Sequence, residues 1–308
     1  MKKLLTALMI LAVNSLFAQQ EALFSQYMFN KLTINPGYAG SHDKFAADVV
    51  YRYQWVQMDG APKTLTASLH TPFPKFPQHS MGLYISNDKI GPMNYTEALA
   101  TYAYRIIFPK SKLSFGIQAG IKNNGILWDD FRAYDEDDPF LINKNQVDNK
   151  TIFDANFGIY YYTENFYAGL SSQQLLQNQS LLVTDSLGNT QFAKLSAHFF
   201  GMTGFAIPLG ESLVFLPSFL LKSVKNATPQ LDLNASLQIT DAFLIGLSYR
   251  TVEALSVITE VKLSQNIFLG LSYDVWLNKL KTYNKGSYEI RLSYEINSGK
   301  RMLSPRYF

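Results

Sequence analysis

The sequence contains no cysteine among its 308 residues. This absence excludes disulfide bonds, thiolate metal ligands and cysteine nucleophiles, and it leaves no residue for the lipid anchor of a lipoprotein. Charged residues make up only 17% of the chain and the net charge is +3, which is too small to indicate binding to nucleic acid. No stretch beyond the N-terminal leader approaches 18 consecutive apolar residues, so the sequence predicts no membrane-spanning helix.

The first 18 residues have the composition of a secretory signal peptide. Lys2 and Lys3 precede an apolar stretch from Leu4 to Val13, and Ala18 ends the segment. About 10 apolar residues cannot cross roughly 30 Å of hydrocarbon, which argues against a transmembrane anchor. We therefore predict export with cleavage after Ala18, followed by a periplasmic N-terminal segment, 19–44, that leads into the first strand.

Apolar and polar residues alternate along most of the chain. In the segment 288–296, tyrosine, isoleucine and leucine alternate with Glu289, Arg291, Ser293 and Glu295. Side chains of a strand have a period of two, so this segment meets lipid on one face and a polar space on the other. Aromatic residues make up 14% of the chain, as aromatic girdles at the membrane surfaces would require. The pattern predicts an all-β fold, a transmembrane antiparallel β-barrel in the outer membrane.

We predict about fourteen strands, in a barrel that spans residues 45–296, followed by a periplasmic tail, 297–308. The even-numbered connections are mostly short and the odd-numbered ones are longer, as in barrels with tight periplasmic turns and long outer loops. The predicted strands are 45–55, 64–70, 80–88, 95–106, 112–122, 152–163, 165–171, 195–207, 212–222, 230–239, 242–250, 255–263, 267–275 and 287–296.

Two segments fit this scheme less well. Pro217 lies inside the ninth predicted strand and lacks a ladder donor, which predicts a bulge or a local irregularity. The connection 71–80 contains three prolines and predicts a stiff, extended excursion in place of a tight inner turn. A soluble β-sandwich or propeller is the alternative fold, because any half-buried sheet alternates. The scarcity of charge on the outward faces favours the membrane barrel.

The inward face carries charges of both signs. This mixture favours cross-strand pairing that braces the wall, in place of a selectivity ring of one sign. Bulky side chains also point inward, at Tyr160, Tyr162, Phe200 and Leu216, so we expect a constricted or occluded lumen. Glycines on this face suit places where interior groups approach the wall closely. The charges predicted to face the lumen are Asp48, Arg52, Arg105, Asp232, Arg250, Glu260, Lys262, Asp274, Glu289, Arg291 and Glu295.

Catalytic chemistry has little support in the sequence. His42, His70, His79 and His198 are not spaced as metal-ligand pairs, and no nucleotide fingerprint is present. Outer-membrane lipases use a serine and a histidine on the outer wall of the barrel, but alternation places His198 on the inner face. We expect a protein that is not an enzyme and that has no cofactor or catalytic metal.

The predicted loop between strands five and six contains an acidic and aromatic stretch, 128–138. Three interpretations remain open: a solvated acidic surface, a calcium site built from carboxylates without EF-hand spacing, and a protein-docking loop outside the cell. The candidate docking residues are Trp128, Asp129, Asp130, Phe131 and Tyr134.

Several motifs in the N-terminal third are not explained by alternation. They are 26–30, 35–41, 54–55, 59–64, 70–72 and 87–92, and a further motif ends the chain at 304–308. The series resembles the PorP/SprF family of outer-membrane proteins, found with the type IX secretion system and gliding machinery of Bacteroidota. Lys31 stands where the family pattern would have proline. The motif residues that could contact a partner are Gln26, Tyr27, Asn35, Pro36, Tyr38, Gly40, Trp55, Gly60, Ala61, Pro62, Lys63, Asn87, Asp88, Gly91 and Pro92.

The resemblance implies a non-enzymatic barrel that assists the secretion or surface anchoring of a large adhesin through its C-terminal domain. The implied partners are this secreted cargo, periplasmic and lipoprotein components of the secretion or gliding apparatus, and outer-membrane lipid. The motifs also permit a purely structural role, with Asn35–Gly37 as a turn before strand one and 59–62 and 88–92 as outer hairpins. Two other functions remain open: a passive solute porin, and a core secretion component that all cargo requires.

Overall fold

The computed structural model describes residues 24–126, 149–184, 190–225 and 227–296. The predicted signal peptide, the acidic stretch 128–138 with its candidate docking residues, and the predicted C-terminal tail therefore lie outside the described residues.

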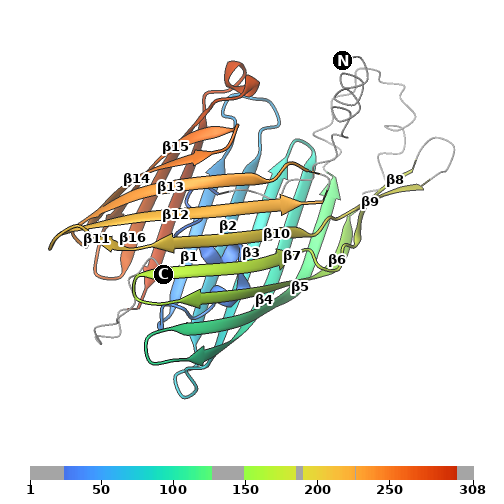
Figure 1. Ribbon diagram of the computed structural model, residues 1–308. Coiled ribbons are helices and arrows are strands. Elements are labelled where there is room, and N and C mark those ends of the chain that lie inside the picture. The colour runs from blue at the N-terminus through green and yellow to red at the C-terminus, as the bar shows by residue number, and fades with distance from the viewer. Residues whose placement is uncertain (1–23, 127–148, 185–189, 226, 297–308) are drawn as a thin grey trace, which may run out of the picture.

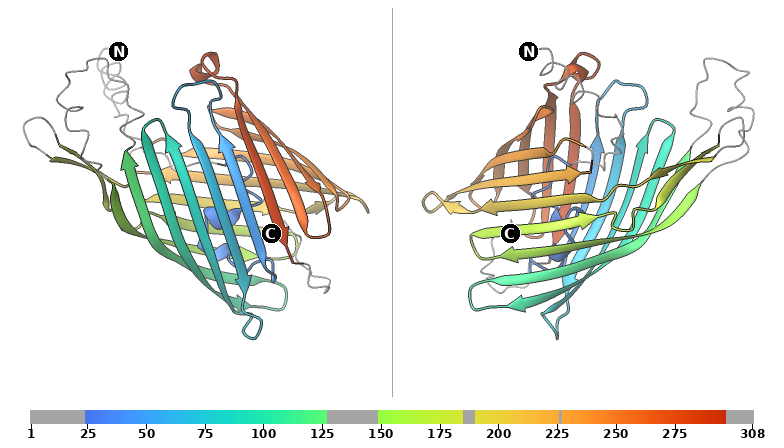
Figure 2. Two further views of the ribbon diagram at one scale, coloured as in Figure 1. Left: turned by 180° about the vertical axis from the view of Figure 1, so that it is seen from behind. Right: turned by 45° about the vertical axis from the view of Figure 1, so that its right-hand side comes forward.

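Within the described residues, fourteen strands form one antiparallel sheet that closes into a barrel, and the two-residue β11 (Ile207–Pro208) pairs beside β12 in the same sheet (Figures 1 and 2). Neighbours follow chain order, and the ring is completed where β1 pairs with β17, from Ala46 opposite Glu295 to Tyr53 opposite Tyr288. The strands are β1 (Ala46–Tyr53), β2 (Lys63–Pro72), β3 (His79–Ile90), β4 (Met93–Ile107), β5 (Lys112–Ile126), β6 (Lys150–Tyr162), β7 (Phe166–Gln173), β10 (His198–Phe205), β12 (Leu213–Val224), β13 (Gln230–Ile239), β14 (Phe243–Arg250), β15 (Ala254–Lys262), β16 (Ile267–Trp276) and β17 (Ser287–Glu295).

Each predicted strand corresponds to one of these, so the predicted barrel is confirmed and the soluble alternative is wrong. Burial alternates residue by residue, as in β14 and β17, with apolar side chains on the outer face and polar ones on the inner face. Leu247 on the outside is 53% exposed, whereas Arg52 on the inside is completely buried. Among the described residues, no helix is long and apolar enough to cross a bilayer.

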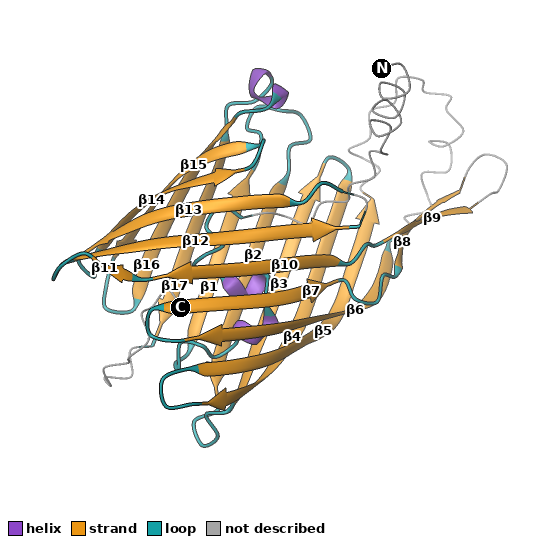
Figure 3. Cartoon of the chain, in the orientation of Figure 1, coloured by secondary structure: helices purple, strands orange, loops and turns teal. Residues whose placement is uncertain are grey.

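The two ends of the barrel differ. The connections after β6, β13 and β15 are short turns at the end where β1 begins, and we call this the short-turn end. The connections after β5, β7 and β16 lie at the opposite, long-loop end, which by the general rule for bacterial barrels faces the exterior. A hairpin of β8 (Gln179–Thr184) and β9 (Thr190–Lys194) projects there, and η4 (Lys279–Thr282) lies between β16 and β17 (Figures 1 and 3).

The two segments that fitted the pattern less well have distinct outcomes. Pro217 causes no bulge, because β12 keeps an unbroken register with β13. Pairing with the other neighbour is interrupted between β10 and the two-residue β11 (Ile207–Pro208), opposite Pro217, so the predicted local irregularity is present. The connection between β2 and β3 spans 73–78 and is folded back by a hydrogen bond from the Phe73 amide to the His79 carbonyl (2.9 Å). It is therefore a compact loop and not an extended excursion.

From residue 24 onward, the N-terminal segment lies inside the barrel, which corrects the prediction that this part is a periplasmic leader. Residues 24–45, here called the plug, contain two short helices, η1 (Lys31–Thr33) and η2 (Pro36–Tyr38), which the strands surround in Figure 3. Tyr27 is 1% exposed and Leu32 is completely buried. These apolar side chains would be costly in water, and the lumen removes them from it.

Candidate functional site

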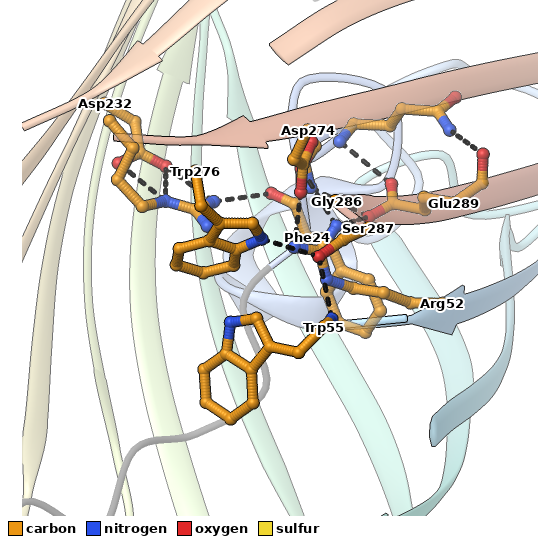
Figure 4. Close-up of polar contacts among 12 residues, drawn as sticks. Phe24, Arg52, Trp55, Asp232, Asp274, Trp276, Gly286, Ser287 and Glu289 are labelled. Carbon is orange, nitrogen blue, oxygen red and sulfur yellow. Dashed lines mark hydrogen bonds and ion pairs between the residues drawn. The ribbon is translucent and has the colours of Figure 1, made fainter. Parts of the chain in front are cut away.

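The plug enters the long-loop end of the barrel through a cluster of buried charges (Figure 4). Arg52 of β1 donates to Asp274 of β16 (2.6 Å) and to Glu289 of β17 (2.9 Å). Glu289 also accepts hydrogen bonds from the backbone amides of Ser25 (2.8 Å) and Gln26 (2.9 Å). The Ser25 hydroxyl donates to Asp274 (2.7 Å). Three strands thus hold the first turn of the plug, and we call these residues the entrance clamp.

Another ion pair lies beside the entrance clamp. Arg250 contacts Asp232 at 3.0 Å, and its guanidinium donates to the carbonyl of Phe24 (3.4 Å). Near it, the Trp276 indole donates to the Ser287 hydroxyl (2.9 Å), which also accepts from the Trp55 amide (3.1 Å) (Figure 4). These bonds join the connection after β1 to the ends of β16 and β17.

Arg291 holds the middle of the plug. It donates to Asp48 (2.7 Å) and to Glu260, and its guanidinium lies 4.7 Å from the centre of the Phe29 ring. A cation over an aromatic face is attracted by the ring quadrupole, most strongly where water is excluded. The inward charges do brace the wall, as predicted, but they also fix the plug.

The Asn35–Gly37 motif seats the plug against β6 and β7. Asn35 caps η2 by accepting from the Gly37 amide (2.8 Å), and its amide nitrogen donates to the carbonyls of Ile159 (3.0 Å) and Leu170 (3.3 Å). Pro36 at the first helical position has no amide hydrogen to satisfy. The predicted turn is confirmed, although it lies inside the barrel and not at its edge.

Wall glycines make room for this turn. A Cβ atom on Gly116 would lie 2.2 Å from the Pro36 carbonyl carbon, and one on Gly158 would lie 2.0 Å from Asn35 Oδ1. A Cβ atom on Gly270 would lie 2.2 Å from Gln26 Oε1. Only glycine permits such close approach, so the predicted role of inward glycines is confirmed.

The plug ends at a second polar cluster at the short-turn end. Arg105 donates to the Gly40 carbonyl, to Asp43 (2.6 Å) and to the Tyr162 hydroxyl (3.1 Å). Gly40 has a φ of 75°, which favours glycine, and its amide donates to His70 (3.0 Å). This cluster ties the plug to β2, β4 and β6.

His42 is buried in the same cluster and is neutral at pH 7. Its Nε2 lies 2.6 Å from the Tyr38 hydroxyl. Burial lowers the pKa of His42 to about 3, which outweighs the opposing effect of Glu295. The contact of 3.5 Å between His42 and Glu295 is therefore not an ion pair, and Lys44 neutralises Glu295 instead, at 2.5 Å.

The motif residues fall into two groups. Those in the plug are all buried and meet the barrel's own strands: Gln26, Tyr27, Asn35, Pro36, Tyr38 and Gly40. Those at the long-loop end shape its connections: Trp55, Gly60, Ala61, Pro62, Lys63, Asn87, Asp88, Gly91 and Pro92. There the Gly91 amide donates to the Gly60 carbonyl (2.8 Å), which joins the two outer hairpins. The described contacts of both groups are structural.

The sequence did not reveal what the inward charges hold. Their strand phase and their mutual pairing were predicted, but several of them also bind the backbone and side chains of the plug. One signal was present: Tyr27–Phe29, Leu32 and Ile34 give an apolar character to a segment that we expected to lie in water. Such a segment needs a surface that covers it.

A cavity of about 260 Å³ remains beside the plug at the long-loop end. Its floor includes Tyr27 and Ile34, and its wall comes from β2 to β7, β10 and β12. Lys122 in this wall forms ion pairs with Glu97 (3.0 Å) and Asp154 (3.5 Å). No cluster of three potential metal ligands is present in the described part of the chain.

Comparisons with known proteins place this barrel in a family. The sequence profile of the family described as "Type IX secretion system membrane protein PorP/SprF" matches residues 16–294. Comparison with curated proteins gives no match.

Three solved barrels are similar in structure. Omp33 of Acinetobacter baumannii is 10% identical with a TM-score of 0.49, covering 82% of this chain and 98% of its own. The toluene transporter TbuX of Ralstonia pickettii is 10% identical with a TM-score of 0.49, covering 87% and 93%. The monoaromatic hydrocarbon channel CymD is 9% identical with a TM-score of 0.49, covering 92% and 96%.

The family match spans the plug as well as the strands, from residue 16 to residue 294. It includes the motifs that seat the plug and those that join the outer hairpins. The protein is an outer-membrane β-barrel, and it belongs to the PorP/SprF family of type IX secretion system membrane proteins.

Proposed function

We propose that this barrel retains a large type IX cargo protein, such as an adhesin, at the cell surface by binding its C-terminal domain. Family membership supports a role in type IX secretion. The observation that favours retention over transport is the plug. It runs from Phe24 at the long-loop end to Asp43 at the short-turn end, and both ends are tied to the wall.

A polypeptide could cross this lumen only if the plug left it. Leaving would break the entrance clamp, the contact of Phe29 with Arg291 and the seat of Asn35. The buried carboxylates of Asp274 and Glu289 would lose the donors of Ser25 and Gln26, and the loss of hydrogen bonds to buried charged groups is expensive. The cargo therefore reaches the surface by another route and meets this barrel from outside.

The surfaces available for partners follow from this orientation. The long-loop end faces the cargo, and the acidic loop with Trp128, Asp129, Asp130, Phe131 and Tyr134 stays a candidate docking element. The short-turn end faces periplasmic and lipoprotein components of the apparatus. The outward apolar faces of the strands meet outer-membrane lipid.

Deletion of the gene tests the proposal. One adhesin should disappear from the cell surface, as read by surface proteolysis and immunolabelling, while other type IX cargo still exits. Unchanged display of every cargo protein would contradict the proposal. Loss of all type IX cargo would instead identify a core secretion component.

The porin alternative has its own test. Planar-bilayer recording of the purified full-length chain should show no stable open channels, because the plug occupies the lumen. Stable channels of porin size would favour passive solute diffusion.

A further inference from the structure

The cavity beside the plug lies on one side of the lumen. The side formed by β13 to β17 is occupied by the entrance clamp and the pairs of Arg250 and Arg291. The cavity lies against β2 to β7. The lining residues of these strands are near the long-loop end, for example Thr64, Ser86 and Asn124. The plug closes its floor, so an occupant must enter from the exterior.

The size of the cavity limits the occupant. Pockets for drug-sized ligands have roughly 300–1,000 Å³, and this one has about 260 Å³. It is therefore large enough for one or two side chains and a short stretch of main chain, but not for a folded domain. A long extended segment could continue from it to the exterior.

The lining combines apolar and amide groups. Leu99, Phe200 and Leu220 offer a buried apolar surface, and carboxamides of Gln118, Asn156 and Gln174 lie in the same cavity. The Asn156 side chain donates to Gln118 Oε1 (2.9 Å) and accepts from the backbone amide of Gln174 (3.0 Å). The fixed carboxamides of Gln118 and Asn156 beside an apolar surface suit a peptide, which presents main-chain amides beside apolar side chains.

The wall carries charges of both signs, with carboxylates in excess. Lys122 pairs with Glu97 and Asp154, and Asp88 also lines the cavity, so the wall disfavours anions. The main chain of the wall is already committed to ladder pairs, because the sheet closes on itself. A peptide inside the lumen therefore cannot add as a further strand, and side chains must recognise it.

We propose that this cavity binds an extended segment of the cargo polypeptide, which inserts a large apolar side chain against Leu99 and Phe200. The proposal rests on the retention function and specifies where that function is carried out. Recognition of an apolar anchor beside a few polar groups is the usual design of peptide sites, in which a buried anchor supplies most of the affinity.

The absence of cysteine allows a clean accessibility test on intact cells. The variant Ser86→Cys places a thiol in the cavity wall, and Asp59→Cys places one on an exposed outer turn. A membrane-impermeant maleimide should label both in a strain whose type IX translocon is inactive, because no cargo then reaches the surface. In a secreting strain, labelling of Ser86→Cys should fall at least tenfold and that of Asp59→Cys should not change.

Photocrosslinking identifies the occupant. Benzoylphenylalanine in place of Tyr84, which lines the cavity, should crosslink to a peptide from the C-terminal domain of a secreted protein, as read by mass spectrometry. The same group in place of the neighbouring Leu83, which is 37% exposed on the outer face, should give no such product. A crosslink from Tyr84 to glycan alone would overturn the proposal.

Filling the cavity supplies an independent readout. Ser86→Trp should reduce cargo display at least tenfold, whereas Ile85→Trp, on the outer face of the same strand, should not.

If Ser86→Trp fails to fold, the labelling of Ser86→Cys still tests the proposal. Equal labelling of Ser86→Cys with and without cargo, in a strain where gene deletion abolishes display, would refute this site and leave the retention function intact. Unchanged display after gene deletion would refute the retention function itself.

Discussion

The entrance clamp predicts how firmly the plug is held. Glu289 accepts two backbone amides of the plug and pairs with Arg52, and its side chain is completely buried. Hydrogen bonds to a charged group contribute about 1.5–3 kcal/mol each. The Arg52–Glu289 pair lies within the wall and does not change when the plug opens, so only the two bonds from Ser25 and Gln26 count. At the lower end of the range they give about 3 kcal/mol for Glu289→Ala.

That loss should appear as local opening of the plug and not as unfolding of the barrel. A free-energy change of about 3 kcal/mol corresponds to a roughly hundredfold increase in the opening equilibrium. The reporter is a thiol introduced by Met28→Cys, at a plug position that is 6% exposed. When closing is fast, the rate of maleimide labelling is proportional to the opening equilibrium, so labelling of the purified protein should accelerate about a hundredfold.

Two further variants test whether the faster labelling results from the lost bonds to Glu289. Glu289→Gln keeps the shape and an acceptor but loses the charge, and charge-assisted bonds are roughly twice as strong as neutral ones, so a smaller acceleration, about tenfold, is expected. Asp241→Ala removes an exposed carboxylate from a short turn and should leave the rate unchanged. If Glu289→Ala labels at the parent rate while circular dichroism shows an intact barrel, the entrance clamp does not hold the plug.

Three further changes probe the rest of the plug. Deletion of 24–41 should convert the non-conducting barrel into one with stable channels in planar bilayers, and continued silence would show that other groups block the lumen. In Gly158→Ala the new Cβ would lie 2.0 Å from Asn35 Oδ1, so the variant should lose about 1–3 kcal/mol of folding stability and unfold at a lower temperature. Gly201→Ala is the matched control: its new Cβ would lie 3.6 Å from the nearest atom, and the unfolding temperature should change little. His42 has a pKa of about 3 in the fold and 6.5 as its ordinary value, so the released plug binds a proton that the seated plug does not. Plug opening should therefore become easier as the pH falls below 6.5. His42→Gln should weaken that dependence, read by the labelling of Ala39→Cys, and the remainder would come from His70, which the plug also covers.

The barrel could be predicted from the sequence because the signal is local and repeated. The lipid-facing side of each strand must be apolar and the lumen side can be polar, so apolar and polar residues alternate along every strand. The strand ends differ from the prediction by only a few residues; β5, for example, ends at Ile126 and not at 122. Pro217 shows the limit, because the sequence identifies the missing donor but not which of the two neighbouring strands would have received it.

The plug could not be predicted in this way because its contacts are not local. Glu289 is 264 residues from Ser25 in the chain, and no period links them. Asn35–Gly37 reads correctly as a turn, yet the same turn would form on either side of the membrane. The turn lies in the lumen because Gly116 and Gly158 of the wall leave room for it. These two glycines are neighbours only after β5 pairs with β6, so their positions in the sequence do not indicate the site.

The plug and wall depend on each other for energetic reasons. Without the plug, Glu289 would lose both backbone donors and Asp274 would lose the Ser25 hydroxyl, although Arg52 would still neutralise them. Water would have to replace these donors, and the apolar faces of Tyr27 and Leu32 would become exposed at about 25 cal/mol for each Å². A porin that conducts solutes through an open, water-filled lumen has no use for such a filling. A barrel that must keep its lumen closed under a load at the long-loop end does need it. The hydrogen bonds from Ser25 and Gln26 to Glu289 and the ion pair of Arg105 with Asp43 anchor the plug to the wall at both ends.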